Sequence, residues 1–327
     1  MLILISGFSP LTVFGVMIQG ALGTEAGQSY VLTYAATLIL SGLAFMIPGK
    51  AGIWNVGAQG QIYLGGIFAT LVALFVPMPF VLWPVVAFLF GALFGAIWAF
   101  IPGVLETYRR ASAIVTTILL NYVAQAMSSY ILFNYVGRIL PQTLVSNQTP
   151  LFSNLVTLPR IPGFSASIMI FISILTAIAA WYFLNRTTLG YKIRAVGSSP
   201  MSAEAKGIDP RTMRIIAMAI GGLIAGLAGA GDILSRGNYV DQFPEGYFGG
   251  EGFAGIAVAL VALNNPIAAI AAAFFFAVMV AGTPFMGAEG LPRELVWAIQ
   301  GLIILFTAMP YLSQLILKRT GRKRLWP

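Results

Sequence analysis

Long apolar segments that contain almost no charged residues recur along the whole chain. Each is close to the roughly 20 residues that an α-helix needs to cross a bilayer. The segments are Tyr30–Ile47, Asn55–Val76, Phe80–Ile101, Ala113–Asn134, Ser165–Leu184, Arg214–Gly231, Pro266–Gly282 and Leu295–Leu317. Only 9% of the 327 residues are charged, against roughly 25% in a soluble domain. The sequence therefore predicts an all-α polytopic membrane protein with about 8 full transmembrane helices, in one transmembrane domain over residues 1–327.

Two shorter apolar runs do not fit this length. Phe253–Leu263 is too brief to cross alone and is expected to form a short helix that ends at the turn Asn264-Asn265-Pro266. Met1–Ile5 is an apolar stub that lacks the features of a signal peptide. We expect it to be the end of a further helix that precedes this sequence.

Three glycine motifs are open to functional or packing interpretations. Gly250–Gly255 has the G-x-G-x-x-G spacing of a dinucleotide site, but no strand precedes it and no acid follows at the required distance. We expect it to be a flexible entrance to the short helix. Gly91/Gly95 and Gly222/Gly226 have the G-x-x-x-G spacing that allows close helix contact. Internal packing is the expected role of both pairs.

The basic residues are unevenly distributed between the connections. Alternating the predicted spans places 14 of the 18 Lys and Arg residues on one side, and all but three of the acids on the other. Positive charge marks the cytoplasmic side, so the connection 185–213 and the basic tail 318–327 are predicted to be cytoplasmic. The acids placed outside are Glu25, Asp232, Asp241, Glu245, Glu251, Glu289 and Glu294. The protein is expected in the plasma membrane with a cytoplasmic C-terminus, and the basic tail is an anchor, not a nucleic-acid site.

The residue types that are absent exclude most catalytic chemistry. The chain contains no Cys and no His, so thiol nucleophiles, imidazole bases and the usual metal sites are excluded. The interiors of the predicted spans carry no ionisable residue, which argues against proton-driven carriers and intramembrane enzymes. We expect no enzymatic activity, cofactor or metal. Sodium coupling through neutral oxygen ligands remains open.

Neutral polar side chains do occur in the spans at helical spacing. One stripe comprises Thr117, Asn121, Gln125 and Ser128, and a second comprises Asn55, Gln59 and Tyr63. An amide in hydrocarbon needs a partner. Two interpretations remain open: hydrogen bonds between helices, or the lining of a path for a neutral hydroxylated solute.

The cytoplasmic connection 185–213 contains the signals of a short capped helix. Ser199 fits an N-cap, Pro200 the first helical position and Gly207 a C-cap, which predicts a helix over Pro200–Lys206. A docking element for a cytoplasmic partner explains such a helix better than a passive loop.

These residues resemble a known family. Arg194–Gly197, Ala205–Ile208 and Gly221–Ala230 are similar to the coupling region of ABC importer permeases that carry ribose-like sugars, purine nucleosides and branched-chain amino acids. Gly52–Gln61 resembles the signature of the nucleoside and simple-sugar members, although these commonly have Glu at the position of Gln59. Asn121–Ala124 and Gly255–Leu260 also match, and the resemblance extends from about residue 7 to about residue 310.

The resemblance implies a type II ABC importer permease for a nucleoside or simple sugar. Its expected partners are a cytoplasmic ATPase subunit that hydrolyses ATP, a second related permease and an extracytoplasmic solute-binding protein. The residues expected to couple to the ATPase are Gly197, Pro200, Glu204, Ala205, Lys206 and Gly207. The alternatives are a subunit for branched-chain amino acids or another small neutral solute, and a sodium-coupled secondary carrier.

Overall fold

The computed structural model describes residues 8–79, 82–153, 156–239, 250–288 and 295–306, apart from 297 and 304. Within these residues, seven helices are long and apolar enough to cross a membrane. They are α3 (Glu25–Lys50), α4 (Ala58–Phe75), α5 (Leu82–Arg109), α6 (Ala113–Ile131, continued to Ile139), α9 (Met169–Arg186), α12 (Pro210–Arg236) and α14 (Pro266–Ala288). Seven of the eight predicted spans are thus confirmed as helices. Most of the eighth, the stub Met1–Ile5 and the basic tail lie outside the described residues.

Shorter helices connect or flank these seven. They are α2 (Pro10–Leu22), α7 (Gly137–Ile139), α8 (Gln142–Ser146), α10 (Thr188–Ser198), α11 (Pro200–Ala205) and α13 (Glu251–Val261), and a π-helical turn covers Leu132–Val136. Over the described part of the chain no strand forms, and one isolated bridge joins Arg160 to Ser167. The expected short helix is confirmed as α13.

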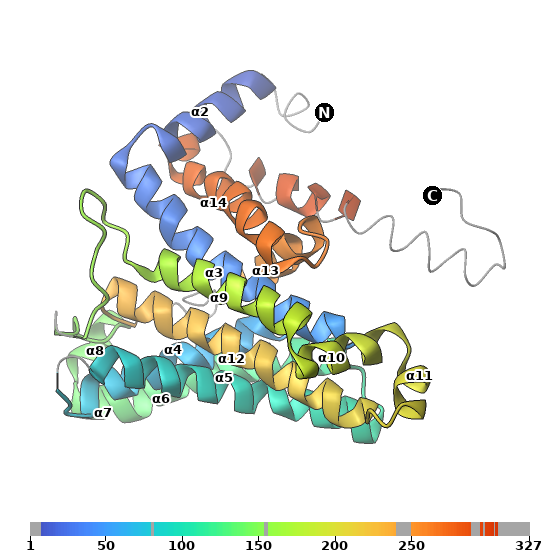
Figure 1. Cartoon of the computed structure of the whole chain (residues 1–327). Coiled ribbons are helices and arrows are strands. Elements are labelled where there is room, and N and C mark those ends of the chain that lie inside the picture. Colours follow the sequence, from blue (N-terminus) through green and yellow to red (C-terminus); the bar gives the residue numbers. More distant parts are fainter. Residues whose placement is uncertain are drawn as a thin grey trace.

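The long helices form one bundle in which α12 and α3 are central (Figure 1). Helix α12 packs against α5 and α4 on one side and against α3 on the other, and α3 also contacts α13, α14 and α9. Helices α10 and α11 lie at one end of the bundle and α7 and α8 at the opposite end (Figure 1). The chain therefore has two polar ends joined by apolar helices.

The two G-x-x-x-G pairs meet each other where α5 crosses α12. A Cβ on Gly226 would overlap the carbonyl oxygen of Gly91, and a Cβ on Gly222 would overlap that of Gly95. Gly65 of α4 is equally close to the backbone of Gly226. Backbones can approach this closely only without side chains, so the predicted packing role of both pairs is confirmed.

The glycines at the start of α13 have a different role from the one expected. Gly250 has a left-handed φ of +94° just before the helix begins. A Cβ on Gly252 would overlap the backbone of Gln59, and one on Gly255 would lie 2.5 Å from Ser41. The motif places α13 tightly against α3 and α4, so close packing, not flexibility, explains these glycines.

Four of the described helices were not predicted: the short helices α7 and α8, and the longer helices α2 and α10. Helix α2 has 13 residues, fewer than the roughly 20 apolar residues by which transmembrane helices are recognised in a sequence. Helix α10 lies in the connection 185–213, where its polar composition conceals an amphipathic helix with Ile193 and Val196 buried. The predicted second stripe is also corrected, because α4 begins at Ala58 and Asn55 therefore lies in the preceding turn.

Candidate functional sites

The end of the bundle that carries α10 and α11 presents a short, rigid helix. The Ser199 hydroxyl accepts a hydrogen bond from the Ser202 N–H at 3.3 Å, and Pro200 is the first helical residue. Gly207 follows the helix with a left-handed φ of +77°. The predicted N-cap is therefore confirmed, whereas α11 ends at Ala205, one residue earlier than expected, so that Lys206 is the C-cap and Gly207 is the left-handed residue after it.

A small apolar cluster fixes α11 to its neighbours. Ala203 is buried against Val196 of α10 and Met213 of α12. The opposite face of α11 is exposed, and its Met201 side chain is 83% accessible. The side chains of Glu204, Ala205 and Lys206 are exposed as well. The buried Ala203 therefore fixes one face of α11 and leaves the face with Met201 accessible at this end of the bundle.

Gly197 differs from the other predicted coupling residues. A Cβ at this position would overlap the carbonyl oxygen of Lys50, at the end of α3. Gly197 thus allows α10 to pack directly on the backbone of α3. Gly197 therefore makes a contact inside this chain, and this contact joins α10 and α11 to α3, a central helix of the bundle.

The amides of the predicted stripes form hydrogen bonds between segments far apart in sequence. Asn121 of α6 accepts from the Gly60 N–H at 2.8 Å and donates to the Val56 carbonyl at 3.0 Å. Gln59 accepts from the Gly252 N–H at 2.8 Å. These are contacts of helix packing and favour the first of the two interpretations, while a role in translocation stays a prediction.

The remaining stripe residues are also largely interior. Asn55 and Gln61 exchange two amide hydrogen bonds of 3.0 and 2.9 Å. Thr117 is buried and donates to Ala113, one turn earlier. Tyr63 is buried and Gln125 is half-buried. The two stripes therefore meet, since α4 packs on α6, but most of their polar atoms already have partners.

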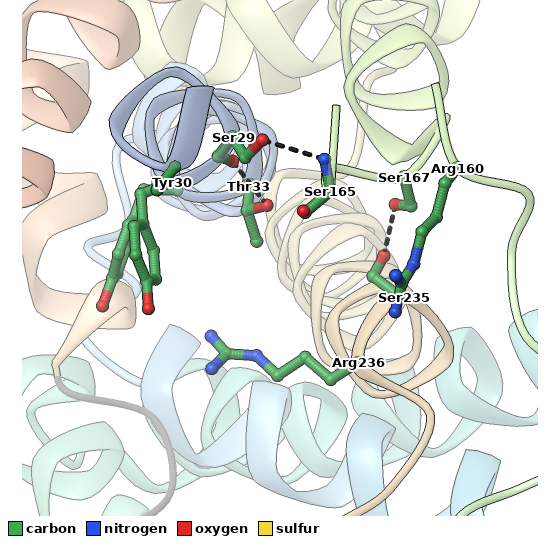
Figure 2. A pocket seen from close by; sticks show the side chains of 10 residues that line it. Ser29, Tyr30, Thr33, Arg160, Ser165, Ser167, Ser235 and Arg236 are labelled. Atoms are coloured by element: carbon green, nitrogen blue, oxygen red, sulfur yellow. Dashed lines mark hydrogen bonds between the residues drawn. The ribbon is translucent and has the colours of Figure 1, made fainter. Parts of the chain in front are cut away.

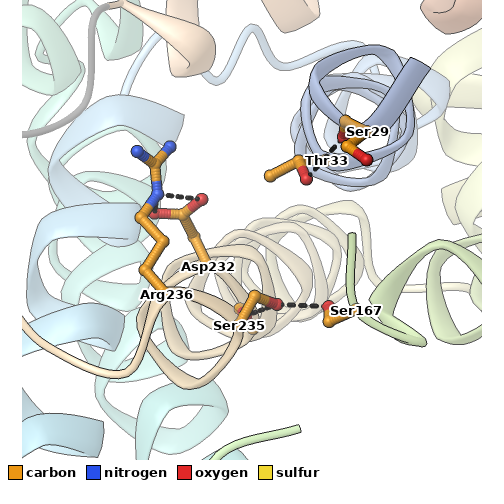
Figure 3. A network of polar contacts seen from close by, with 7 residues as sticks. Ser29, Thr33, Ser167, Asp232, Ser235 and Arg236 are labelled. Carbon is orange, nitrogen blue, oxygen red and sulfur yellow. Dashed lines mark hydrogen bonds and ion pairs between the residues drawn. The ribbon is translucent and has the colours of Figure 1, made fainter. Parts of the chain in front are cut away.

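Two acids that sequence analysis placed in outer connections are buried. Asp232 lies in the last turns of α12, where both carboxylate oxygens contact the Arg236 guanidinium at 2.9 and 3.0 Å (Figure 3). Glu251 begins α13 and is 8% exposed. Both acids lie outside the predicted spans, whose interiors hold no Asp, Glu, Lys or Arg, and they belong to helices because α12 and α13 extend further than their apolar runs.

A pocket of about 380 Å³ lies beside this ion pair, at the end opposite α10 and α11 (Figure 2). Its walls come from the start of α3, the segment before α9 and the end of α12. Seven of its ten lining residues carry a hydroxyl group, and Arg160 and Arg236 are its cations. Sequence analysis missed it because its residues fall at the ends of three separate segments.

This architecture defines a multi-pass helical membrane protein. The chain belongs to the family described as the permease component of the branched-chain amino acid transport system, whose model matches residues 11–308.

Several relatives with named activities cover most of the chain. A glucose ABC transporter permease protein of Haloferax volcanii is 35% identical, over 91% of this chain and 80% of its own length. A nucleoside ABC transporter permease protein of Lactococcus lactis is 30% identical, over 96% and 87%. A guanosine ABC transporter permease protein of Bacillus subtilis is 29% identical, over 99% and 92%. The family resemblance found in the sequence is therefore confirmed.

Proposed function

We propose that this chain is the membrane subunit of an ABC importer that moves a nucleoside or simple sugar, driven by ATP hydrolysis in a separate subunit. The observation that carries this proposal is the similarity, over at least nine-tenths of the chain, to permeases named for glucose, nucleosides and guanosine. The neutral polar groups of the bundle interior suit an uncharged solute. The family description itself mentions branched-chain amino acids, which remain the alternative solute.

The α10–α11 element is the proposed docking site for the ATPase. The fixed buried face at Ala203 and the exposed Met201 support this role. Pro200, Glu204, Ala205, Lys206 and Gly207 would face the partner, while Gly197 would transmit movement through its contact with the end of α3. A carrier without an ATPase would have no need of this element.

The same end of the bundle is the proposed cytoplasmic end. Exposed basic residues Lys192, Lys206 and Arg211 lie there, as expected for positive-inside flanks. The opposite end would face outward, toward a solute-binding protein, and a second related permease would complete the membrane unit. The C-terminal tail is proposed to be cytoplasmic.

Uptake into cells that express the complete transporter tests this function. We expect accumulation of radiolabelled inosine or D-glucose, but not of leucine, and its loss on ATP depletion. Replacing external sodium by choline should leave the rate unchanged. Leucine uptake alone would replace the proposed solute, and sodium-dependent uptake in ATP-depleted cells would establish the carrier alternative.

A further inference from the structure

The pocket at the end of α3 and α12 has the size of a small-molecule site. Its volume of about 380 Å³ lies within the roughly 300–1,000 Å³ range of ligand pockets. Figure 2 shows Tyr30, Ser29 and Thr33 on one wall and Ser167, Ser235 and Arg160 on the other, with Arg236 extending below them. Its chemistry therefore depends on which of these groups already have partners.

The α3 wall offers one hydrogen-bond donor beside one acceptor. The Ser29 hydroxyl accepts from the Ser165 N–H at 2.9 Å, which leaves its own proton for another partner. The Thr33 hydroxyl donates to the Ser29 carbonyl at 2.9 Å, so the lone pairs of the Thr33 oxygen can accept a hydrogen bond from a solute. Because Ser29 and Thr33 are one helical turn apart, their side chains are neighbours. A solute hydroxyl, which both donates and accepts, complements this pair.

The opposite wall contributes acceptors. Ser235 donates to the Gly231 carbonyl at 2.6 Å, so in the 2.6 Å contact between Ser167 and Ser235 the proton comes from Ser167 (Figure 3). The protons of the Ser167 and Ser235 hydroxyls are therefore both engaged, and the oxygens of these groups can act only as hydrogen-bond acceptors for a solute. Together the two walls can contact several hydroxyl groups of one molecule.

One of the two cations of the pocket is paired with an acid. Asp232 pairs with Arg236, and Glu251, Asp232 and Arg236 all lie within electrostatic range of Tyr34. Arg160 is the second cation of the lining, and neither Asp232 nor Glu251 is a lining residue. Tyr30, half exposed, adds a flat aromatic face. A hydroxylated ring complements the hydroxyl groups of the lining and this aromatic face.

We infer that this pocket binds the hydroxylated sugar ring of the transported solute, so that the permease itself selects a furanose or pyranose before translocation. The inference rests on the proposed function and assigns it a residue set that differs from the predicted stripes on α4 and α6.

Equilibrium binding of tritiated inosine to the full-length chain in lipid nanodiscs tests this site. Thr33→Val retains the shape of the side chain and removes the acceptor, so we expect affinity to fall about tenfold, the effect of one lost hydrogen bond to a solute hydroxyl. Unlabelled 2′,3′-dideoxyinosine should compete poorly against wild type, and Thr33→Val should reduce this discrimination between the two nucleosides. Tyr30→Ala should weaken binding, whereas Tyr30→Phe should retain it.

The matched control is Thr176→Val on α9. Its hydroxyl makes the same bond to the carbonyl one turn earlier, at 2.8 Å to Ile172, and it does not line this pocket. Three results would each overturn the inference and leave the proposed function standing. The first is wild-type affinity in Thr33→Val, and the second is an equal loss of affinity in Thr33→Val and Thr176→Val. The third is the absence of binding in nanodiscs by a transporter that imports inosine into cells. If cells import leucine but neither inosine nor D-glucose, the proposed function fails as well.

Discussion

At the scale of single residues, Gln59 and Asn121 accept hydrogen bonds from backbone N–H groups of other segments. Gln59→Leu would leave the Gly252 N–H without this acceptor in an apolar interior, at a cost of about 1–3 kcal/mol. We therefore expect a lower Tm for purified Gln59→Leu, and the same for Asn121→Leu. Gln59→Glu retains an acceptor and should melt closer to wild type. Thermal unfolding in detergent measures the effect.

Uptake by the same variants separates packing from translocation. If Gln59→Leu and Asn121→Leu melt and accumulate like wild type but no longer transport, the packing role is contradicted and the translocation path is supported. The exposed Val145→Ala variant, far from both amides in sequence and 90% accessible at that residue, serves as the neutral control.

Residue roles could be predicted only in part. The cost of an unpaired amide in hydrocarbon indicates that Asn121 and Gln59 are partnered. Their partners are 61 and 193 residues away, so only the fold identifies them. The hydroxyls of the pocket carry no periodic signal, because Ser29, Ser167 and Ser235 belong to different segments.

At the scale of the helices, Gly207 limits α11 with a positive φ that Val adopts only at a cost of about 1–2 kcal/mol. We expect Gly207→Val to distort the end of α11 and uncouple ATP hydrolysis from transport. Solute-stimulated ATPase activity and uptake of the reconstituted transporter should both fall severalfold.

The control for this variant is Gly163→Val. Gly163 also has a positive φ, +83°, and open space around a Cβ, but it lies before α9 at the other end of the bundle. Equal losses in the two variants would indicate a general effect of strain, and wild-type values in Gly207→Val would refute coupling through α11.

Helix α12 depends on the cap at its N-terminal start. Asp209 accepts from the Arg211 and Thr212 N–H groups at 3.0 and 3.2 Å. The Thr212 hydroxyl and the Arg211 N–H hold the pKa of Asp209 below its ordinary value. The cap is therefore intact at neutral pH and is lost as the pH falls through that lowered pKa. Asp209→Ala should lower the free energy of unfolding by about 1 kcal/mol, and Asp209→Asn by less, as thermal unfolding at neutral pH would show.

Helices could be predicted from the sequence where a long apolar segment or a pair of capping residues indicated them. The long spans and α11 were anticipated for these reasons. Helix α10 has a Thr187 cap on the Gly190 N–H and a buried Ile193–Val196 face, signals that were present but weak beside the surrounding charge. Helix α13 was expected, but burial of Glu251 at its start required the packing of Gly252 on Gln59.

At the scale of the whole molecule, the orientation follows from which end carries basic charge. Two side chains report it with similar accessibility: Val145 in α8 is 90% exposed and Met201 in α11 is 83% exposed. They lie at opposite ends of the bundle (Figure 1), and the chain has no native cysteine.

An impermeant maleimide should label Val145→Cys in intact cells and Met201→Cys only after permeabilisation, because the membrane alone separates the reagent from α11. Permeabilised cells that express this chain without the ATPase must label both variants, because the proposed docking of the ATPase on α11 would otherwise cover Met201→Cys. Labelling of Met201→Cys but not Val145→Cys in intact cells would reverse the orientation, and with it the proposed outward-facing position of the sugar pocket.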